Sequence, residues 1–213
     1  MRLYLSSFRI GNKPEALLAL LKGGVRTALI LNADDYKSTQ DRAASLQREV
    51  AELRSVGLNP AEVDLRDFFG SNEELGTKLS EVDLVYVRGG NVFLLRRALR
   101  QSGADHILTD LLLRDAVAYA GYSAGSCILG PTLHGIEGDE DDPHYVPDGY
   151  DEAVVWSGLG ILPFAIAPHD VPDAVASAAK RSIEYYVEHH IPFVALRDGQ
   201  ALVIDDEEHH IAG

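Results

Sequence analysis

Short apolar runs alternate with amphipathic stretches along almost the whole chain, and this rhythm limits the folds that the sequence can adopt. The apolar runs predict buried strands at residues 2–6, 26–31, 61–65, 84–87, 116–120, 161–167, 191–196 and 201–204. Helical periodicity predicts helices at 13–22, 39–56, 73–79, 93–101, 107–115 and 173–188. Strands that are too apolar to expose one face to solvent are typical of a mostly parallel sheet between two helical layers. We therefore predict a single-domain α/β fold, a three-layer α/β/α sandwich, over residues 1–213.

The charge balance excludes several classes of partner. Lys and Arg total 19 and Asp and Glu total 33, so the formal net charge is −14. A surface this acidic repels nucleic acid and anionic membranes.

No apolar run approaches the roughly 20 residues that a bilayer requires, and the N-terminal residues do not resemble a cleaved leader. The single cysteine, Cys127, excludes an internal disulfide and a Cys-rich zinc site. We expect a cytoplasmic protein that binds neither nucleic acid nor membrane.

The sequence GYSAG at residues 121–125 is the first candidate for chemistry. This G-x-S-x-G pattern follows the predicted strand 116–120 and precedes an apolar run, 124–129, that can start a helix. A sharp strand-to-helix turn exposes a serine hydroxyl above the sheet, and glycines around it avoid backbone clashes. The pattern therefore predicts a nucleophile elbow with Ser123 as the nucleophile and an anion-binding amide at Ala124. The alternative is a glycine-rich tight turn with an incidental serine.

A serine nucleophile needs a base, and the chain has eight histidines. His144 lies within a long acidic loop, where no strand end holds it in place. His169 closes the apolar stretch 161–167, so we expect it at the carboxyl end of a strand, on the same sheet edge as Ser123. Two His-His pairs occur elsewhere without the spacing of a metal site, so no metal is predicted.

Two further strand ends carry candidate residues. Asp198 follows the predicted strand 191–196 and can orient the imidazole of the base; an ordinary Asp-Gly turn is the alternative. The sequence RGGN at 88–91 follows the strand 84–87, where a glycine amide can face a substrate oxygen. A helix-capping turn is the alternative there. The loop 137–152 holds eight acidic residues without the spacing of a calcium loop, and we expect it to be solvated or to act as a lid.

Taken in order, these motifs resemble a known family. A GGN turn after a buried strand, a GxSAG elbow about 32 residues later, a Pro-His pair after an apolar run and an acid-Gly turn near the end are similar to the aspartyl dipeptidases (the peptidase E family). These are serine peptidases related to cyanophycinases. The resemblance covers roughly residues 1–204. It implies a monomer or homodimer that cleaves short peptides through an acyl-enzyme, without metal or cofactor.

The resemblance also assigns roles to individual positions. It implies Ser123 as nucleophile and His169 as general base, with Asp198 where the family usually has glutamate. The amides of Gly90 and Ala124 would form the oxyanion hole.

Two departures from the family pattern concern the substrate. The arginine with which family members bind an N-terminal aspartate aligns near Ala179, beside Lys180 and Arg181. Arg88 replaces a glycine of the usual GGGN turn, where it either binds a substrate carboxylate or is a surface arginine. Arg88, Asn91, Lys180 and Arg181 are therefore the candidate substrate-binding residues. The resemblance leaves open an N-terminal Asp preference or a preference for another residue.

Two other functions remain possible from the residues. A non-catalytic α/β module could bind a small ligand in the same crevice. A Cys127-dependent amidotransferase is disfavoured, because Cys127 lies four residues beyond Ser123, inside the predicted helix.

Overall fold

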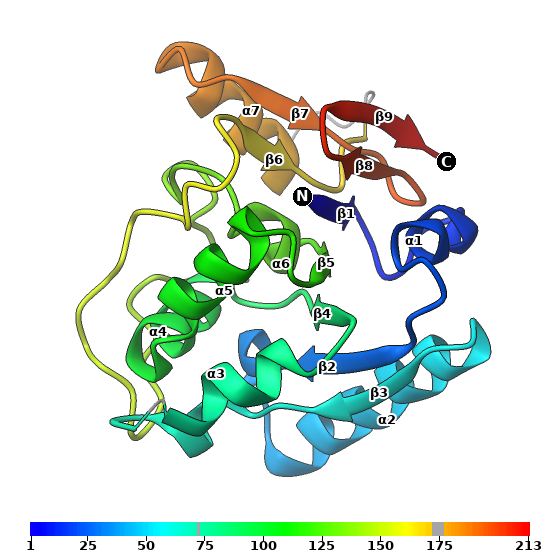
Figure 1. The fold of residues 1–213 in the computed structure, drawn as a ribbon. Coiled ribbons are helices and arrows are strands. Elements are labelled where there is room, and N and C mark those ends of the chain that lie inside the picture. The colour runs from blue at the N-terminus through cyan, green and yellow to red at the C-terminus, as the bar shows by residue number, and fades with distance from the viewer. Residues whose placement is uncertain (72, 172–176) are drawn as a thin grey trace.

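The computed structural model of the protein describes residues 1–71, 73–171 and 177–213 (Figure 1). Its main sheet has seven strands in the order β3-β2-β4-β5-β1-β8-β9. These strands are β1 Arg2–Ser6, β2 Arg26–Ile30, β3 Asn59–Glu62, β4 Leu84–Val87, β5 Ala118–Tyr122, β8 Ala201–Asp205 and β9 Glu208–Ala212. The first five in that order pair in parallel, whereas β8 pairs antiparallel with β1, and β9 with β8. The predicted mostly parallel sheet is confirmed.

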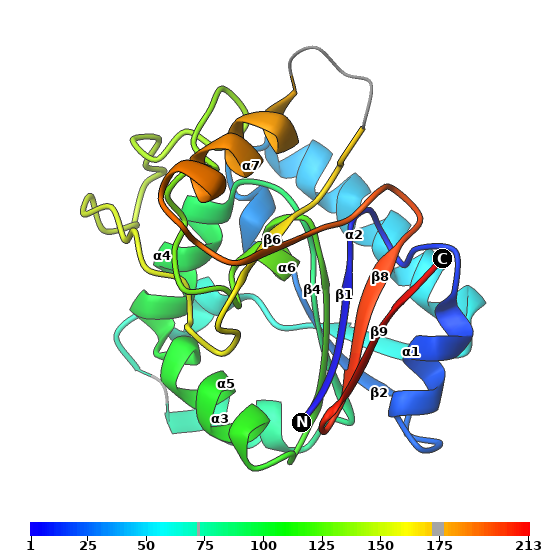
Figure 2. The ribbon, with the colours of Figure 1, turned by 90° about the horizontal axis from the view of Figure 1, so that it is seen from above.

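Helices cover both faces of this sheet. They are α1 Pro14–Leu20, α2 Thr39–Ser55, α3 Glu73–Ser80, α4 Val92–Ser102, α5 Ala104–Leu113, α6 Ala124–Cys127 and α7 Ala178–Glu188, with 3₁₀ turns at Asn32–Asp34 and Leu65–Phe68. Figure 2 shows α1 and α2 on one side of the strands and α3, α4 and α5 on the other. None of the described helices is both long and apolar enough to cross a membrane.

The alternation of side chains explains why the strands are apolar throughout. In β1, Leu3 and Leu5 join the core under α4 and α5, while Tyr4 points to the opposite face and joins the core under α1 and α2. Because successive side chains of a strand point to opposite faces, a strand covered on both sides must be apolar at every position. The three-layer α/β/α class is therefore confirmed.

Two predicted strands do not belong to the main sheet. The runs 161–167 and 191–196 contain β6, Ala165–Ala167, and β7, Phe193–Ala195, which pair in parallel with each other alone. The expectation that His169 and Ser123 lie on the edge of one sheet is therefore wrong. β8 occupies the free edge of β1 and leaves no place there for β6 and β7. The helix α7 packs on this small sheet through Tyr186.

Several element boundaries differ from the prediction. The strand predicted at 116–120 lies at 118–122, because Asp115, at φ 51°, ends the preceding helix segment and Tyr122 pairs with Ser6 of β1. Gly103, at φ 74°, separates α4 from α5, so α5 begins before residue 107. The first part of the helix predicted at 173–188 lies outside the described residues. Ser177 caps α7 by accepting a hydrogen bond from the Lys180 amide.

Candidate active site

The turn between β5 and α6 holds Ser123 in a conformation that few L-residues adopt. Its φ is 49° and its ψ is −116°. The glycines on both sides allow the close packing that this turn requires. A Cβ at Gly121 would lie 2.6 Å from the carbonyl oxygen of Gly125, and one at Gly125 would lie 2.2 Å from that of Val87. The local sequence therefore folds as the predicted elbow, with the serine side chain directed into a cavity.

Ser123, His169 and Asp198 form one hydrogen-bonded chain. Nε2 of His169 lies 3.1 Å from Oγ of Ser123, and Nδ1 lies 2.7 Å from Oδ1 of Asp198. Because an ionised carboxylate only accepts hydrogen bonds, Nδ1 carries the ring proton in this arrangement. Nε2 is then free to accept the proton of the serine hydroxyl. The structure thus brings together three residues that are far apart in the sequence.

The ends of β6 and β7 position the imidazole and the carboxylate. Leu196 N–H donates to the Ala167 carbonyl at 2.9 Å, and Asp170 N–H donates to the Leu196 carbonyl at 3.0 Å, which joins the two segments beyond the small sheet. His169 itself has φ 59°. The Phe8 ring and the imidazole pack in a T-shaped arrangement, with 6.0 Å between ring centroids.

Ser7 is a site residue that the sequence analysis missed. Its Oγ accepts the N–H of His169 at 2.8 Å and donates to Oδ1 of Asp198, also at 2.8 Å. One hydroxyl thus connects the backbone of the base to the carboxylate that orients it. Ser7 directly follows β1, so the rule that located the other candidates at strand ends also applies to this position.

The Gly89–Gly90 turn lies beside Ser123. Gly90 has φ 147°, and a Cβ there would lie 2.4 Å from the carbonyl oxygen of Ala33. A Cβ at Gly89 would lie 2.9 Å from Cβ of Ser123. Within the described part of the chain, the amides of Gly90 and Ala124 donate to no backbone carbonyl. Both amides are therefore available to an oxygen bound next to Ser123.

Arg88 has a different role from the predicted one. Its guanidinium pairs with Asp34 and, at 3.1 Å, with Glu49, and its side chain is only 12% exposed. Nη1 also donates to the carbonyl of Gly89 at 2.7 Å. Two carboxylates neutralise this cation, so it does not serve a substrate carboxylate. Instead, its hydrogen bond to the Gly89 carbonyl holds the peptide group between Gly89 and Gly90, whose N–H is the Gly90 amide.

The buried position of Arg88 leads to a prediction about stability. Arg88→Met leaves the buried Glu49 without its cation and leaves Asp34 with Lys37 alone, and removal of one partner from a buried ion pair costs about 3–5 kcal/mol. We expect the free energy of unfolding, measured by urea titration at pH 7, to fall by about that amount. The exposed Arg54→Met on α2 is the control and should change it by less than about 0.5 kcal/mol. An equal effect of both substitutions would contradict the assignment.

Asn91 is also not a substrate contact. Its Oδ1 accepts the N–H groups of Phe93 and Leu94, both at 2.9 Å, and so caps α4. Its Nδ2 donates to the carbonyls of Glu140 and Asp142 at 3.4 and 3.2 Å. The prediction for Asn91 is wrong because both ends of its amide bind backbone groups.

The two cations predicted on α7 do not line the cavity that contains Ser123. Lys180 and Arg181 lie at exposed positions of α7, and the α7 wall of that cavity consists of Ala178, Ala179 and Ser182. Arg181 instead lines an adjoining cavity of about 260 Å³.

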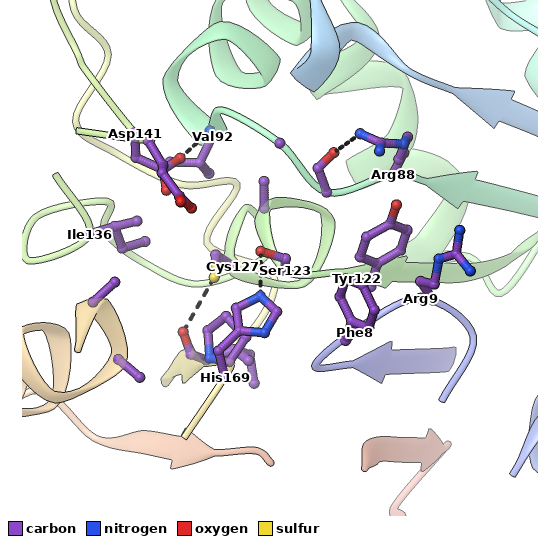
Figure 3. Close-up of a pocket in the computed structure, with 18 of the residues that line it drawn as sticks. Phe8, Arg9, Arg88, Val92, Tyr122, Ser123, Cys127, Ile136, Asp141 and His169 are labelled. Carbon is purple, nitrogen blue, oxygen red and sulfur yellow. Dashed lines mark hydrogen bonds between the residues drawn. The ribbon is translucent and has the colours of Figure 1, made fainter. Parts of the chain in front are cut away.

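The cavity beside Ser123 has a volume of about 450 Å³ (Figure 3). Apolar, cationic and acidic side chains line it, among them Phe8, Arg9, Lys37, Arg48, Arg88, Val92, Cys127, Ile136, Glu140, Asp141 and Ile166. No motif or spacing in the sequence distinguishes Asp141 from the other acidic residues of its loop. Its carboxylate accepts the Val92 N–H at 2.7 Å, at the start of α4. Burial raises the pKa of Asp141 to about 6. This size of cavity suits a small organic ligand.

The acidic loop 137–152 is attached to α4. Arg97 donates to the Pro143 carbonyl at 2.7 Å, and Gln101 donates to the Gly149 carbonyl at 2.8 Å. The hydroxyl of Tyr150 donates to Asp35. These contacts hold the loop against the body of the protein, and they place Asp141 at the cavity.

Cys127 has the properties of a buried structural thiol. Its Sγ lies 3.4 Å from the Ile166 carbonyl, and burial raises the pKa of the thiol. A raised pKa opposes formation of the thiolate, which is the nucleophilic form. Among the described residues, no group of three or more His, Cys, Asp or Glu side chains could hold a metal ion.

Comparisons with known proteins agree with the motifs. The sequence model of peptidase family S51 matches residues 16–212. Peptidase E of Streptomyces coelicolor is 30% identical over 162 residues, 73% of this chain and 62% of that protein. A Drosophila melanogaster protein named "Probable alpha-aspartyl dipeptidase" is 27% identical over 141 residues, 63% of this chain and 55% of that protein. This chain thus matches 55–62% of the length of these two relatives.

The fold is similar to that of a solved structure. A crystal structure from Listeria monocytogenes EGD-e, described as a peptidase E protein, superposes with a TM-score of 0.78. The superposition covers 99% of this chain and 97% of that chain at 22% sequence identity, a likeness that concerns the fold alone. The family match spans nearly the whole sequence, and it confirms the resemblance of the four motifs to peptidase E. This chain belongs to peptidase family S51.

Proposed function

We propose that this protein is a serine peptidase that hydrolyses dipeptides or other short peptides through an acyl-enzyme. The hydrogen-bonded chain from Ser123 through His169 to Asp198, at the wall of a cavity, is the observation that carries the proposal. Membership of family S51 supports a peptidase. The cytoplasmic location, the single domain and the monomeric or homodimeric state stay predictions from the sequence.

The first half of the reaction acylates Ser123. Nε2 of His169 takes the hydroxyl proton as Oγ attacks the peptide carbonyl, and Asp198 stabilises the imidazolium that forms. The oxyanion accepts hydrogen bonds from the amides of Gly90 and Ala124. His169 then protonates the leaving amine, and the acyl group stays on Ser123. Arg88 is a positioning residue here, because it binds the carbonyl of the peptide group that carries the Gly90 amide.

The second half of the reaction returns the enzyme to its resting state. A water molecule takes the place of the released amine, and His169 removes one of its protons as the oxygen attacks the acyl carbon. Collapse of the second tetrahedral intermediate breaks the bond to Oγ and returns the proton to Ser123. Every proton transfer uses the His169 imidazole, so the cycle requires no cofactor.

The lining of the cavity supports a preference for a neutral first residue. The wall on the α7 side consists of Ala178, Ala179 and Ser182, and Ile136 and Ile166 also face the cavity. Small and apolar groups of this kind favour an uncharged side chain. Glu140 and Asp141 at the same cavity would repel an aspartate side chain.

An N-terminal Asp preference is the second candidate. Arg181 lines the adjoining cavity, which shares Ile136, Glu140, Asp141 and Ala178 with the cavity of Ser123. A substrate carboxylate that reached the adjoining cavity would meet this guanidinium. The name of the Drosophila relative also favours this candidate.

Hydrolysis of a dipeptide panel tests the proposal. The panel contains Ala-Leu, Met-Leu, Gly-Leu and Asp-Leu, and released leucine is measured with the wild type, Ser123→Ala and the exposed control Ser80→Ala. We expect the wild type and Ser80→Ala to cleave at least one peptide and Ser123→Ala to cleave none. A serine-directed phosphonate should label the wild type at Ser123. Cleavage of Ala-Leu and Met-Leu in preference to Asp-Leu supports a neutral first residue, and the reverse order supports the Asp preference.

Two outcomes would contradict the proposal. Turnover that survives in Ser123→Ala would exclude this serine as the nucleophile. A folded protein that binds dipeptides without cleaving them would instead be the non-catalytic binding module.

A further inference from the structure

We infer that Glu49 is a positioning residue that holds both halves of the oxyanion hole through one carboxylate oxygen. This inference rests on the proposed function, in which the amides of Gly90 and Ala124 bind the oxyanion. Glu49 is a buried residue of α2, 1% exposed, and it is not among the described residues that line the cavity. It therefore acts on the reaction through other residues and not through the substrate.

One oxygen of Glu49 accepts two hydrogen bonds. Nε of Arg88 donates to Oε1 at 3.1 Å, and the hydroxyl of Tyr122 donates to the same atom at 2.7 Å. Burial and the charge of Glu49 raise the pKa of Tyr122, so the phenol keeps its proton and acts as the donor. Arg88 directly follows β4 and Tyr122 ends β5. Because β4 and β5 pair in parallel, this single atom joins the carboxyl ends of two neighbouring strands.

On the side of β4, the bond to Glu49 orients the guanidinium that holds the Gly90 amide. Nη1 of Arg88 donates to the Gly89 carbonyl at 2.7 Å, and the peptide group of that carbonyl carries the Gly90 N–H (Figure 3). Asp34 binds Nη1, whereas Glu49 binds Nε. Because a guanidinium is planar and rigid, bonds at two of its nitrogens fix the direction of the third bond, to Gly89.

On the side of β5, the bond to Glu49 holds the residue that precedes the nucleophile. The Tyr122 ring packs against the Tyr86 ring, with 6.3 Å between centroids, and its hydroxyl reaches Glu49. Ala124 follows Tyr122 by two positions, across the turn in which Ser123 has φ 49°. A strained backbone of this kind persists only where the surrounding structure holds it on both sides. A displacement of Tyr122 would therefore move the Ala124 amide as well.

The position of Glu49 in α2 faces the core. Ser45, Glu49 and Leu53 are the buried residues of this helix and follow one another at intervals of four, the spacing of one helix face. Oε2 of Glu49 is buried without a hydrogen-bond partner among the described residues. An unpartnered buried carboxylate oxygen costs free energy that an apolar side chain would avoid. The two bonds accepted by Oε1 give a reason for a glutamate at this position.

Three substitutions and two matched controls test the inference. Glu49→Leu removes the shared acceptor, Glu49→Gln keeps a carbonyl oxygen that can accept both bonds, and Tyr122→Phe removes one of the two donors. Two controls, Glu52→Leu on the same helix and Tyr86→Phe on β4, change buried oxygens that have no hydrogen-bond partner among the described residues. We measure kcat and KM for the best dipeptide of the panel, and urea titration verifies that each variant is folded.

The expected loss is confined to kcat, because the oxyanion exists only in the transition state and the intermediates. Removal of a whole oxyanion donor costs about 10²- to 10³-fold in kcat, so we expect about 10²-fold for Glu49→Leu, which displaces both donors. Tyr122→Phe should cost about tenfold, and Glu49→Gln should stay within about fivefold of the wild type. Both controls should stay within about threefold, and KM should change little throughout.

Two further readouts separate positioning from a general loss of structure. A serine-directed phosphonate places its phosphoryl oxygen where the oxyanion forms, so its rate of reaction with Ser123 should fall in each variant by the same factor as kcat. The double variant Glu49→Leu with Tyr122→Phe should be no slower than Glu49→Leu alone, because the hydroxyl has already lost its acceptor. Independent effects would multiply to about 10³-fold and would contradict the shared bond.

The outcomes that would overturn the inference differ from those that concern the proposed function. A kcat within threefold of the wild type in both Glu49→Leu and Tyr122→Phe, in a Ser123-dependent reaction, would overturn it and leave the peptidase intact. Equal losses in Tyr122→Phe and Tyr86→Phe would also overturn it, and this pair decides the question if Glu49→Leu does not fold. Absence of any Ser123-dependent hydrolysis by the wild type would overturn the proposed function itself, and this inference with it.

Discussion

Asp198→Asn is expected to lower kcat for the best dipeptide by about 10³- to 10⁴-fold and to change KM little. The carboxylate accepts the Nδ1 proton of His169, and this bond leaves Nε2 able to take the proton of Ser123. An asparagine amide can donate to Nδ1 and favour the other tautomer, which carries its proton on Nε2 and cannot act as the base. Steady-state kinetics with the wild type and the variant measure the effect.

Two further substitutions make this prediction specific. Asp205→Asn, at an exposed position at the end of β8, is the control for loss of one negative charge and should leave kcat unchanged. Asp198→Glu restores the carboxylate with a longer side chain and should recover part of the loss. A kcat of Asp198→Asn within tenfold of the wild type would show that Asp198 does not set the tautomer of His169.

Gly125→Ala is expected to lower the free energy of unfolding by more than about 4 kcal/mol and to abolish hydrolysis. A Cβ at this position would lie 2.2 Å from the carbonyl oxygen of Val87 and 2.9 Å from its carbonyl carbon. Val87 belongs to β4, which is hydrogen-bonded to β2 and β5, so that backbone cannot move aside. The helix α6 must shift instead, and Ser123 moves with it. Urea titration and the dipeptide assay measure the two effects.

Gly76 in α3 provides a matched control for this substitution. A Cβ at Gly76 meets no atom within 4 Å, and Gly76 lies within a helix. Because alanine has less conformational freedom in the unfolded chain, Gly76→Ala should stabilise the protein by about 0.4–1 kcal/mol. The same chemical change therefore has opposite expected signs at the two sites. Equal urea midpoints for Gly125→Ala and the wild type would contradict the packing of α6 against β4.

Much of the fold and three of the central site residues could be predicted from the sequence because the signals are local. Strands buried on both faces, such as Leu84–Val87, are apolar at every position, whatever their neighbours are. The elbow around Ser123 depends on glycines within two residues of it. His169 and Asp198 each follow an apolar run, so their positions at strand ends could be predicted without knowing which strands pair.

The pairing of those strands depended on the tertiary structure. The composition of β6 and β7 is equally compatible with strands that extend the main sheet. The hairpin β8–β9 takes the edge of β1, and the two short strands pair with each other instead. Which segment occupies an edge depends on contacts between residues far apart in the chain, and no local pattern records them.

The roles of the polar side chains were decided in the same way. The position of Arg88 in the turn before Gly89 and Gly90 predicts a substrate contact, but Asp34 and Glu49 from two other segments neutralise its charge. Asp141 belongs to a loop with the composition of a solvated segment, yet contacts with α4 bring its carboxylate to the cavity. The sequence by itself determined which residues could do chemistry and at which strand ends they lie. Only the tertiary structure decided which charges are neutralised within the protein and which face the ligand, because electrostatic partners are set by distance in space and not by distance along the chain.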